Sequence, residues 1–168
     1  MQEKVKILAS VQLQTHKNDI RFLFANAFMP VVIDIDKAPT YDLPHGRGKS
    51  IRLFNPSNGA KNVDVHINVL NPGVEKGAIH YHKTIENVYV VLEGTGKIVD
   101  KDNKEYPIKA GQAVFMKPGE GVDTHEIFNT GEGPLRLVEI YAPPQPPEVY
   151  ANVKFDLTKR DHHIVKNV

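Results

Sequence analysis

The chain of 168 residues contains no cysteine and no tryptophan. Without cysteine it can form neither disulfides nor thiolate metal sites, so a metal ion would have to be held by nitrogen and oxygen ligands. The lack of disulfides agrees with a reducing compartment, and we expect a cytoplasmic protein. No segment approaches the roughly 20 apolar residues that span a bilayer. Residues 1–18 also lack the unbroken apolar core of a signal peptide.

A strong charge of either sign is also missing. The 21 lysines and arginines nearly balance the 20 aspartates and glutamates, which leaves a formal net charge of +1. Partners such as nucleic acid or an anionic membrane select for a clear basic excess, so we expect neither. The basic segment HGRGKSIR at 45–52 does not form a phosphate-binding loop, because the position that requires the first glycine is Leu43.

What the sequence does contain is a dense series of short apolar segments separated by glycine- and proline-containing turns, from about residue 50 onward. Residues 63–70 (VDVHINVL) alternate strictly between apolar and other residues, which predicts a strand with Val65 and Ile67 on one face. His66 would then lie on the other face, exposed or at the rim of a pocket. Further strands are expected at 86–93, 97–100, 104–108, 112–117, 123–129 and 135–141. Such spacing predicts an all-β sandwich or barrel.

The positions of the proline- and glycine-containing segments divide the chain into three parts. A barrel is expected at 46–147 and must end within APPQPP (142–147), because consecutive prolines cannot donate the hydrogen bonds of a sheet. Residues 1–45 form an N-terminal extension that packs on the barrel or swaps with a second copy. Residues 148–168 form a short C-terminal tail.

Three of the eight histidines are placed where they could share one metal ion. His80 and His82 are two positions apart in a predicted strand, so their side chains point to the same face. His125 lies in another predicted strand, after a Pro-Gly turn. Two imidazoles at this spacing can reach one metal ion from a sheet. The alternative is three unrelated surface or core histidines.

The segments around these histidines resemble a known pair of motifs. GVEKGAIHYHKTIENVYVVLEG (73–94) and GQAVFMKPGEGVDTHEIFN (111–129) are similar to the two motifs of the cupin superfamily, G(x)5HxH(x)3–4E(x)6G and G(x)5PxG(x)2H(x)3N. The turn in the second motif is slightly longer than in the family. The resemblance implies a double-stranded β-helix, or jelly-roll barrel. It also implies one divalent transition metal ion (iron, manganese, zinc, nickel or copper) held in the barrel mouth by His80, His82, His125 and a fourth ligand.

The fourth ligand is ambiguous. Counting three intervening residues from His82 gives Glu86, whereas counting six back from Gly94 gives Asn87. Alternation along the strand places Asn87 and Tyr89 on one face and Glu86 on the other. A β-bulge would be needed to turn Glu86 inward. The spacing favours Asn87, with Glu86 as the alternative.

Other central residues are expected to line the barrel interior as a substrate pocket: Tyr89, Phe115, Glu139 and Tyr141. Glu139 could act there as a general base; the alternative is a glutamate on the strand surface that faces water. The resemblance implies a metal-dependent enzyme acting on a small organic molecule, of isomerase, lyase or dioxygenase type. A non-catalytic module that binds a sugar or an organic acid is the alternative. Because a jelly roll leaves sheet edges to be covered, we also expect a homodimer.

Overall fold

The computed structural model describes residues 30–119, 124–145 and 163–167. Two compact units are distinguished, Met1–Val32 and Ile33–Val168, and the fold below is that of the second unit. The N-terminal extension up to residue 29 and most of the C-terminal tail therefore lie outside the described residues.

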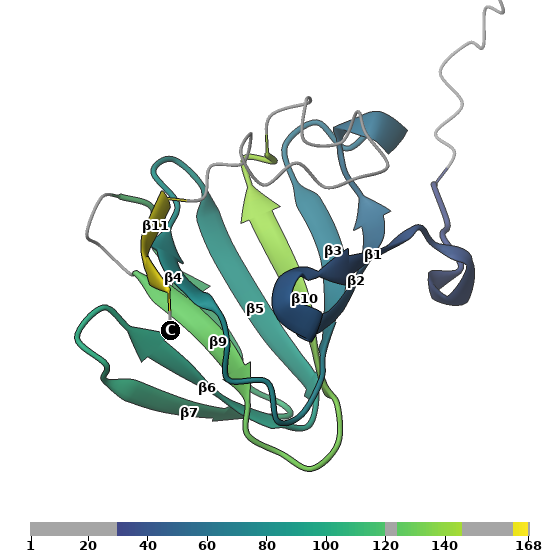
Figure 1. Cartoon of the computed structure of the whole chain (residues 1–168). Coiled ribbons are helices and arrows are strands. Elements are labelled where there is room, and N and C mark those ends of the chain that lie inside the picture. Colours follow the sequence, from purple (N-terminus) through teal and green to yellow (C-terminus); the bar gives the residue numbers. More distant parts are fainter. Residues whose placement is uncertain (1–29, 120–123, 146–162, 168) are drawn as a thin grey trace, which may run out of the picture. The chain divides into compact units, whose positions relative to one another are not determined.

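Two antiparallel sheets face each other in the second unit (Figure 1). The six-stranded sheet has the order β1-β2-β3-β10-β5-β8, formed by Thr40–Leu43, Gly48–Phe54, Asp64–Leu70, Leu135–Ala142, Glu86–Glu93 and Ala113–Met116. The five-stranded sheet has the order β11-β4-β9-β6-β7, formed by His163–Asn167, Ala78–Tyr81, His125–Asn129, Thr95–Asp100 and Glu105–Lys109. Three 3-10 helices, η1 to η3, span Ile35–Lys37, Pro44–Gly46 and Pro56–Asn58. The predicted all-β jelly-roll barrel is confirmed.

Strand positions follow the sequence pattern closely in the centre of the chain. The strand β5 covers residues 86–93, as predicted, and β10 ends at Ala142 where the proline-rich segment begins. Strands also pair with the barrel outside 46–147. β1 begins at Thr40 and pairs with β2, and β11 of the C-terminal tail pairs with β4. None of the helices within the described ranges is long and apolar enough to cross a membrane.

The core between the sheets is apolar toward one end of the barrel. Its buried members come from both sheets: Leu70, Tyr89, Val91, Ile98, Ile108, Ile127, Leu135 and Leu137. Gly96 is required where β6 crosses this cluster, because a Cβ there would lie 2.6 Å from a methyl carbon of Leu135 and from the carbonyl oxygen of Phe128.

A second apolar cluster lies on the opposite face of the six-stranded sheet. It is built on Ile51, Leu53 and Ile67, with Ile33 and Ala38 packed against it. Val65, Ile67 and Val69 of β3 therefore face away from the barrel interior, whereas Asp64, His66 and Asn68 share the interior face with Leu70. His66 has 1% of its surface exposed, so of the two placements expected for it, exposed or at the rim of a pocket, the exposed one is wrong.

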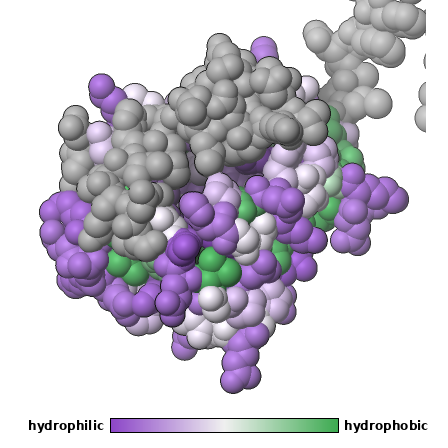
Figure 2. Space-filling model, viewed as in Figure 1, coloured by the Kyte–Doolittle hydropathy of each residue, from purple (hydrophilic) through white to green (hydrophobic). Residues whose placement is uncertain are grey.

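On the face of the molecule shown in Figure 2, hydrophilic residues cover most of the described surface and apolar residues form small patches. The exposed large apolar side chains of the six-stranded sheet, Leu92 and Phe115, belong to β5 and β8. Both strands lie at one side of that sheet, where β8 is the edge strand.

Candidate metal centre

The three histidines of the sequence motif come together inside the barrel. His80 on β4 is paired directly with His125 on β9, and His82 follows one residue after the end of β4. One nitrogen from each ring lies within 4.8 Å of the others. All three side chains are buried, with 7%, 2% and 1% of the residue surface exposed for His80, His82 and His125. This arrangement fits the spacing of nitrogen ligands around a single transition metal ion.

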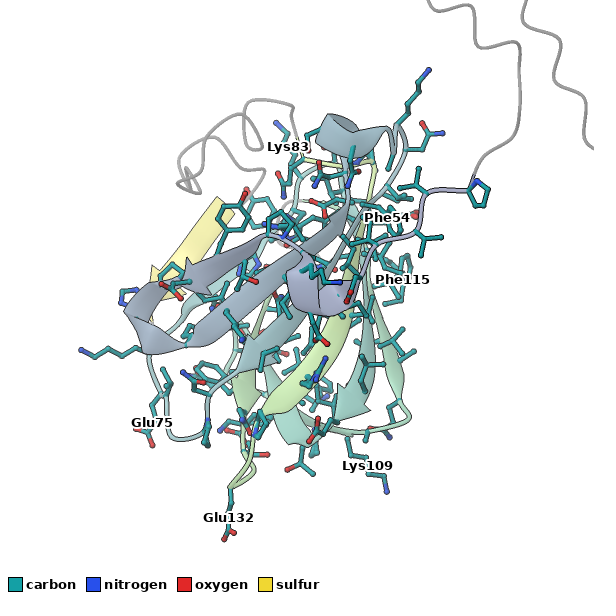
Figure 3. The ribbon with its side chains drawn as sticks, turned by 90° about the vertical axis from the view of Figure 1, so that its right-hand side faces the viewer. Phe54, Glu75, Lys83, Lys109, Phe115 and Glu132 are labelled. Carbon is teal, nitrogen blue, oxygen red and sulfur yellow. The ribbon has the colours of Figure 1, made fainter. Side chains whose placement is uncertain are left out.

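The site lies toward one end of the barrel. Lys83, which follows His82, is at the opposite end from Glu75 and Lys109 (Figure 3). The ring of His82 has its centroid 5.1 Å from that of Tyr141, and the His80 and His125 centroids are 4.6 Å apart. The three imidazoles are therefore held by ring contacts as well as by their strands.

His80 is supported from behind by a buried ion pair. Its Nδ1 lies 3.7 Å from Oε2 of Glu126, a carboxylate with 2% of its surface exposed. Arg47 pairs with the other oxygen of Glu126 and donates to the carbonyl of Ile127 at 3.0 Å. Gly77 leaves the space for this carboxylate, since a Cβ there would lie 2.9 Å from two Glu126 carbons. A carboxylate beside a histidine orients the ring and increases its basicity as a ligand.

Asn87 lies on the interior face of β5, and no part of its surface is exposed. Its amide nitrogen donates to the hydroxyl of Tyr89 at 2.8 Å and to Oε1 of Glu139 at 2.9 Å. Its amide oxygen is buried and accepts no hydrogen bond from the described residues. Since a buried polar atom without a partner is unfavourable, this oxygen is suited to a ligand such as a cation.

Glu86 is placed differently. It is the first residue of β5 and is exposed, on the opposite face from Asn87. The register of β5 against β10 shifts near the other end of the strand, opposite Arg136 and Leu137, and not at Glu86. The structure therefore brings Asn87, but not Glu86, to the interior face of the barrel.

Three of the four predicted pocket residues are inside the barrel. Tyr89, Glu139 and Tyr141 have 4%, 4% and 2% of their surfaces exposed. Phe115 is 51% exposed and points away from the interior (Figure 3), because the alternation along β8 that turns Val114 inward turns Phe115 outward. Placing Phe115 in the pocket was therefore wrong.

Tyr89 connects Asn87 to the histidines. Its hydroxyl accepts from the Asn87 amide and lies 3.0 Å from Nε2 of His125. Burial, with a further contribution from the nearby Glu139 carboxylate, raises the pKa of Tyr89 well above its ordinary value. The hydroxyl therefore keeps its proton at neutral pH.

Several polar residues of the interior were missed by the sequence reasoning. They lie on the six-stranded sheet beside Glu139 and comprise Ser50, Arg52, Asp64, His66 and Asn68, and Glu126 adds a further one on β9. The signal that could have identified them is the set of polar residues in the alternating segment 63–70. Alternation of this kind is also found in a strand whose polar face is exposed to water, so it does not distinguish the two cases.

A cavity of about 450 Å³ is lined by residues of β6, β7 and β8 and by Thr124. Its lining includes Met116, which is paired with Asn87, and Thr124, which precedes His125. The hydroxyl of Thr124 is buried and has no hydrogen-bond partner among the described residues. Ile98, Ile108 and Val114 make one wall apolar, and Asp100, Lys101, Asp102 and Tyr106 complete the lining.

Comparison with known families agrees with this geometry. The family model described as a cupin domain matches residues 66–141, which include the three histidines and most of the strands that form the barrel. Residues 66–141 form a cupin-like domain. The matched segment contains all the positions that the resemblance suggests as metal ligands: His80, His82, Glu86, Asn87 and His125.

Two curated relatives match part of the chain. An uncharacterized protein of Methanocaldococcus jannaschii is 33% identical over 73 residues, which are 44% of this chain and 55% of the relative. An oxalate-binding protein of Thermotoga maritima is 37% identical over 71 residues, which are 42% of this chain and 54% of the relative. The chain thus matches about half the length of each.

Among solved structures, the polyketide cyclase RemF from Streptomyces resistomycificus aligns with a TM-score of 0.63. The alignment covers 82% of this chain and 87% of that one, at 16% sequence identity. At this identity the likeness concerns the fold alone, and it extends beyond the segment matched by the cupin family model.

Proposed function

We propose that this cupin domain binds one divalent transition metal ion and acts as a metal-dependent enzyme on a small organic molecule. The observation that carries the proposal is the set of three buried histidines, whose ligand nitrogens lie within 4.8 Å of one another. Iron, manganese, zinc, nickel and copper all accept imidazole ligands, so the ligand set does not choose among them.

Asn87 is the proposed fourth ligand. Both protons of its amide group are engaged by Tyr89 and Glu139, which leaves the oxygen as the available donor atom. Glu86 is exposed, and it could bind the metal ion only if the start of β5 were rotated so that its other face pointed inward. The residues present therefore fit a metal ion with three nitrogen ligands and one neutral oxygen ligand.

This ligand set also supports a substrate class. Three imidazoles and an amide carry no negative charge, so a bound ion would keep its full positive charge and favour an anionic oxygen ligand. A metal ion so held acts as a Lewis acid toward carbonyl and carboxylate oxygens. We infer that the substrate is a small organic acid. The name of the Thermotoga maritima relative, an oxalate-binding protein, supports the same class.

The chain provides groups that would bind and orient such a substrate. Thr124 offers an unpartnered hydroxyl at the cavity, and Tyr89 and Tyr141 border the histidines. The apolar wall of the cavity would exclude water from the non-polar part of the substrate. Isomerase, lyase and dioxygenase reactions are all compatible with these groups, because the fold does not determine the chemistry.

A non-catalytic binding protein for a sugar or an organic acid is the second candidate. It is favoured by the state of Glu139, the only carboxylate predicted as a general base. This carboxylate already accepts hydrogen bonds from Asn68 and Asn87, and its Oε2 lies 2.8 Å from Nε2 of His66. A carboxylate with so many donors is stabilised as an anion and is a weak base.

The first experiment is elemental analysis of untagged protein purified without added metal. We expect near-stoichiometric iron, manganese, nickel, copper or zinc in the wild-type protein and its loss in H80A. A protein that stays empty after exposure to each of these ions would refute the metal site.

The second experiment separates enzyme from binder. Wild-type and H80A proteins are incubated with a panel of hydroxy acids, oxo acids and dicarboxylates, and each mixture is followed by NMR for product and by calorimetry for binding. Turnover that disappears in H80A supports the enzyme. Binding without turnover across the panel supports the binding protein.

We also propose a homodimer, because the edge strands β1, β8, β7 and β11 need cover. A monomer mass in light scattering would refute it. A cytoplasmic location, and partners limited to small molecules rather than nucleic acid or membranes, stay predictions from the sequence composition.

A further inference from the structure

A second group of charged side chains lies inside the barrel, separate from the three histidines. Arg52 on β2, Asp64 and His66 on β3, and Glu139 on β10 have 6%, 0%, 1% and 4% of their surfaces exposed. The strand register places Arg52 and Glu139 on either side of His66. Charged groups are rarely buried unless they pair with one another. We call these four residues the Asp64–His66 cluster.

Both ring nitrogens of His66 face carboxylates. Nδ1 lies 3.0 Å from Oδ1 of Asp64, and Nε2 lies 2.8 Å from Oε2 of Glu139. A neutral imidazole has one N–H, whereas an ionised carboxylate can only accept. Two such contacts therefore need two protons, since otherwise a ring lone pair would face an anion in a buried site.

With both protons on the ring of His66, the positive and negative charges of the Asp64–His66 cluster are equal in number. The positive charges of Arg52 and His66 then match the negative charges of Asp64 and Glu139. Arg52 lies 3.5 Å from the second oxygen of Asp64, so each carboxylate has a cationic neighbour. A balanced, hydrogen-bonded set is the form in which buried charges are tolerated.

The cluster reaches the proposed metal ligand through Glu139. Oε2 of this carboxylate accepts from His66 and Asn68, and Oε1 accepts from the amide of Asn87. Since the second amide proton goes to Tyr89, the plane of the Asn87 amide is fixed by two partners, one of which is Glu139.

We propose that His66 is a positioning residue, doubly protonated between Asp64 and Glu139, that holds the Glu139 carboxylate and through it the amide of Asn87. The consequence for metal binding rests on the proposed function. The groups that face His66 are Asp64 from its own strand, Arg52 from β2, and Glu139 and Tyr141 from β10. Tyr141 contacts it edge-on, at 5.2 Å between ring centroids.

The charge state of His66 is tested first in the metal-free wild-type protein. Nitrogen-15 NMR of histidine-labelled protein reports directly whether each ring nitrogen carries a proton. Since both ring nitrogens face carboxylates, we expect both to carry a proton in the folded protein. A spectrum with one bare ring nitrogen would overturn the proposal.

The positioning role is tested with H66Q against H45Q. His45 is exposed in the 3-10 helix η2 and serves as the matched control. In H66Q we expect hydrogen exchange of the Asn87 side-chain amide to become about 10-fold faster or more. We also expect zinc affinity to fall about 10- to 100-fold, the range seen when groups behind a metal ligand are removed. H45Q is expected to match the wild type in both. An H66Q protein with wild-type exchange and affinity would overturn the positioning role.

A second variant and two readouts that need no metal distinguish the possible outcomes. If H66Q does not fold, the isosteric D64N replaces it, and its His66 ring is expected to carry a proton on one nitrogen only, because the carboxylate facing Nδ1 is gone. A D64N protein whose ring keeps both protons would contradict the role of Asp64. If the wild-type protein binds no metal, the proposed function fails, whereas the ring spectrum and the Asn87 exchange still decide the proposal for His66.

Discussion

The two ends of the barrel interior differ in chemistry although the same strands build both. Toward one end, β3, β5 and β10 contribute Leu70, Val91 and Leu137 to an apolar core. Toward the other, the same three strands contribute His66, Asn87 and Glu139, with hydrogen bonds among them. The apolar end can be held by area burial alone. The polar end depends on the pairing of every group, because an unpaired buried charge is costly.

The apolar and polar ends of the barrel interior therefore serve different purposes. Apolar contacts tolerate small shifts, so the apolar end can supply stability without fixing individual atoms. Hydrogen-bonded groups in a buried site are fixed in distance and direction. The polar end is therefore where ligand atoms can be positioned, and substitutions in the two ends should have separable effects.

The largest expected effect is the loss of metal from H125A, which removes one of the three ligand nitrogens at the centre of the polar end. We expect stoichiometric binding of zinc or iron in the wild-type protein and none in H125A, measured by elemental analysis and calorimetry. The control is H45A, which removes an exposed histidine. Retention of one ion per chain by H125A would exclude His125 as a ligand.

Next in size is the substitution L137A in the apolar end. Leu137 is fully buried, so removing three carbons should lower the free energy of unfolding by about 2–5 kcal/mol. Urea unfolding of metal-free protein measures this change. Metal affinity of the folded variant should stay within about 2-fold of wild type if the two ends are separable. A large loss of affinity would break the separation.

A smaller effect is expected from E126Q, which keeps the shape of the side chain behind His80 but removes its charge. Metal affinity should fall about 10-fold or more, because the carboxylate orients the ring. Calorimetry with zinc measures the change. E105Q is the matched control, since Glu105 forms an ion pair with Lys97 at the surface and its side chain is 54% exposed. Equal metal affinities for E126Q and E105Q would show that Glu126 does not contribute to metal binding.

The smallest effect concerns pH. The pKa of Tyr89 is raised in the folded state, so above about pH 10 the unfolded chain releases this proton while the folded chain keeps it. Stability from this group is therefore complete below about pH 10 and falls as the pH rises further. Urea unfolding of metal-free wild type and Y89F from about pH 8 to 11 should show a steeper decline for the wild type. Parallel curves would contradict the shift.

The sequence predicted the fold well because strand positions depend on local patterns. Residues 86–93 are rich in β-branched residues and are followed by Gly94, and the structure has β5 at those residues. Gly94 has φ of +85°, a conformation that favours glycine and ends the strand sharply. His80 and His82 were found for the same reason, since residues two apart share a face whatever the rest of the barrel does, whereas His125 was found from the second motif of the cupin resemblance.

The interior of the six-stranded sheet was not found, because alternation does not say which face is inside. Residues 63–70 present an apolar and a polar face, and water ordinarily takes the polar one. In this barrel Ile67 packs outward with Ile51, and His66 points inward. Phe115 was misplaced by the same limit, since a large apolar residue is not always the buried member of its strand.

The sequence by itself therefore determined the strands, the turns and the shared face of His80 and His82, because each follows from residues close together in the chain. Tertiary structure alone decided which face of β3 is interior. It also decided that Glu139 meets His66, since the carboxylate and the imidazole lie on the paired strands β10 and β3, 73 positions apart in sequence. The physical reason is that burial and pairing of charges are properties of the closed barrel and leave no periodic mark on a single strand.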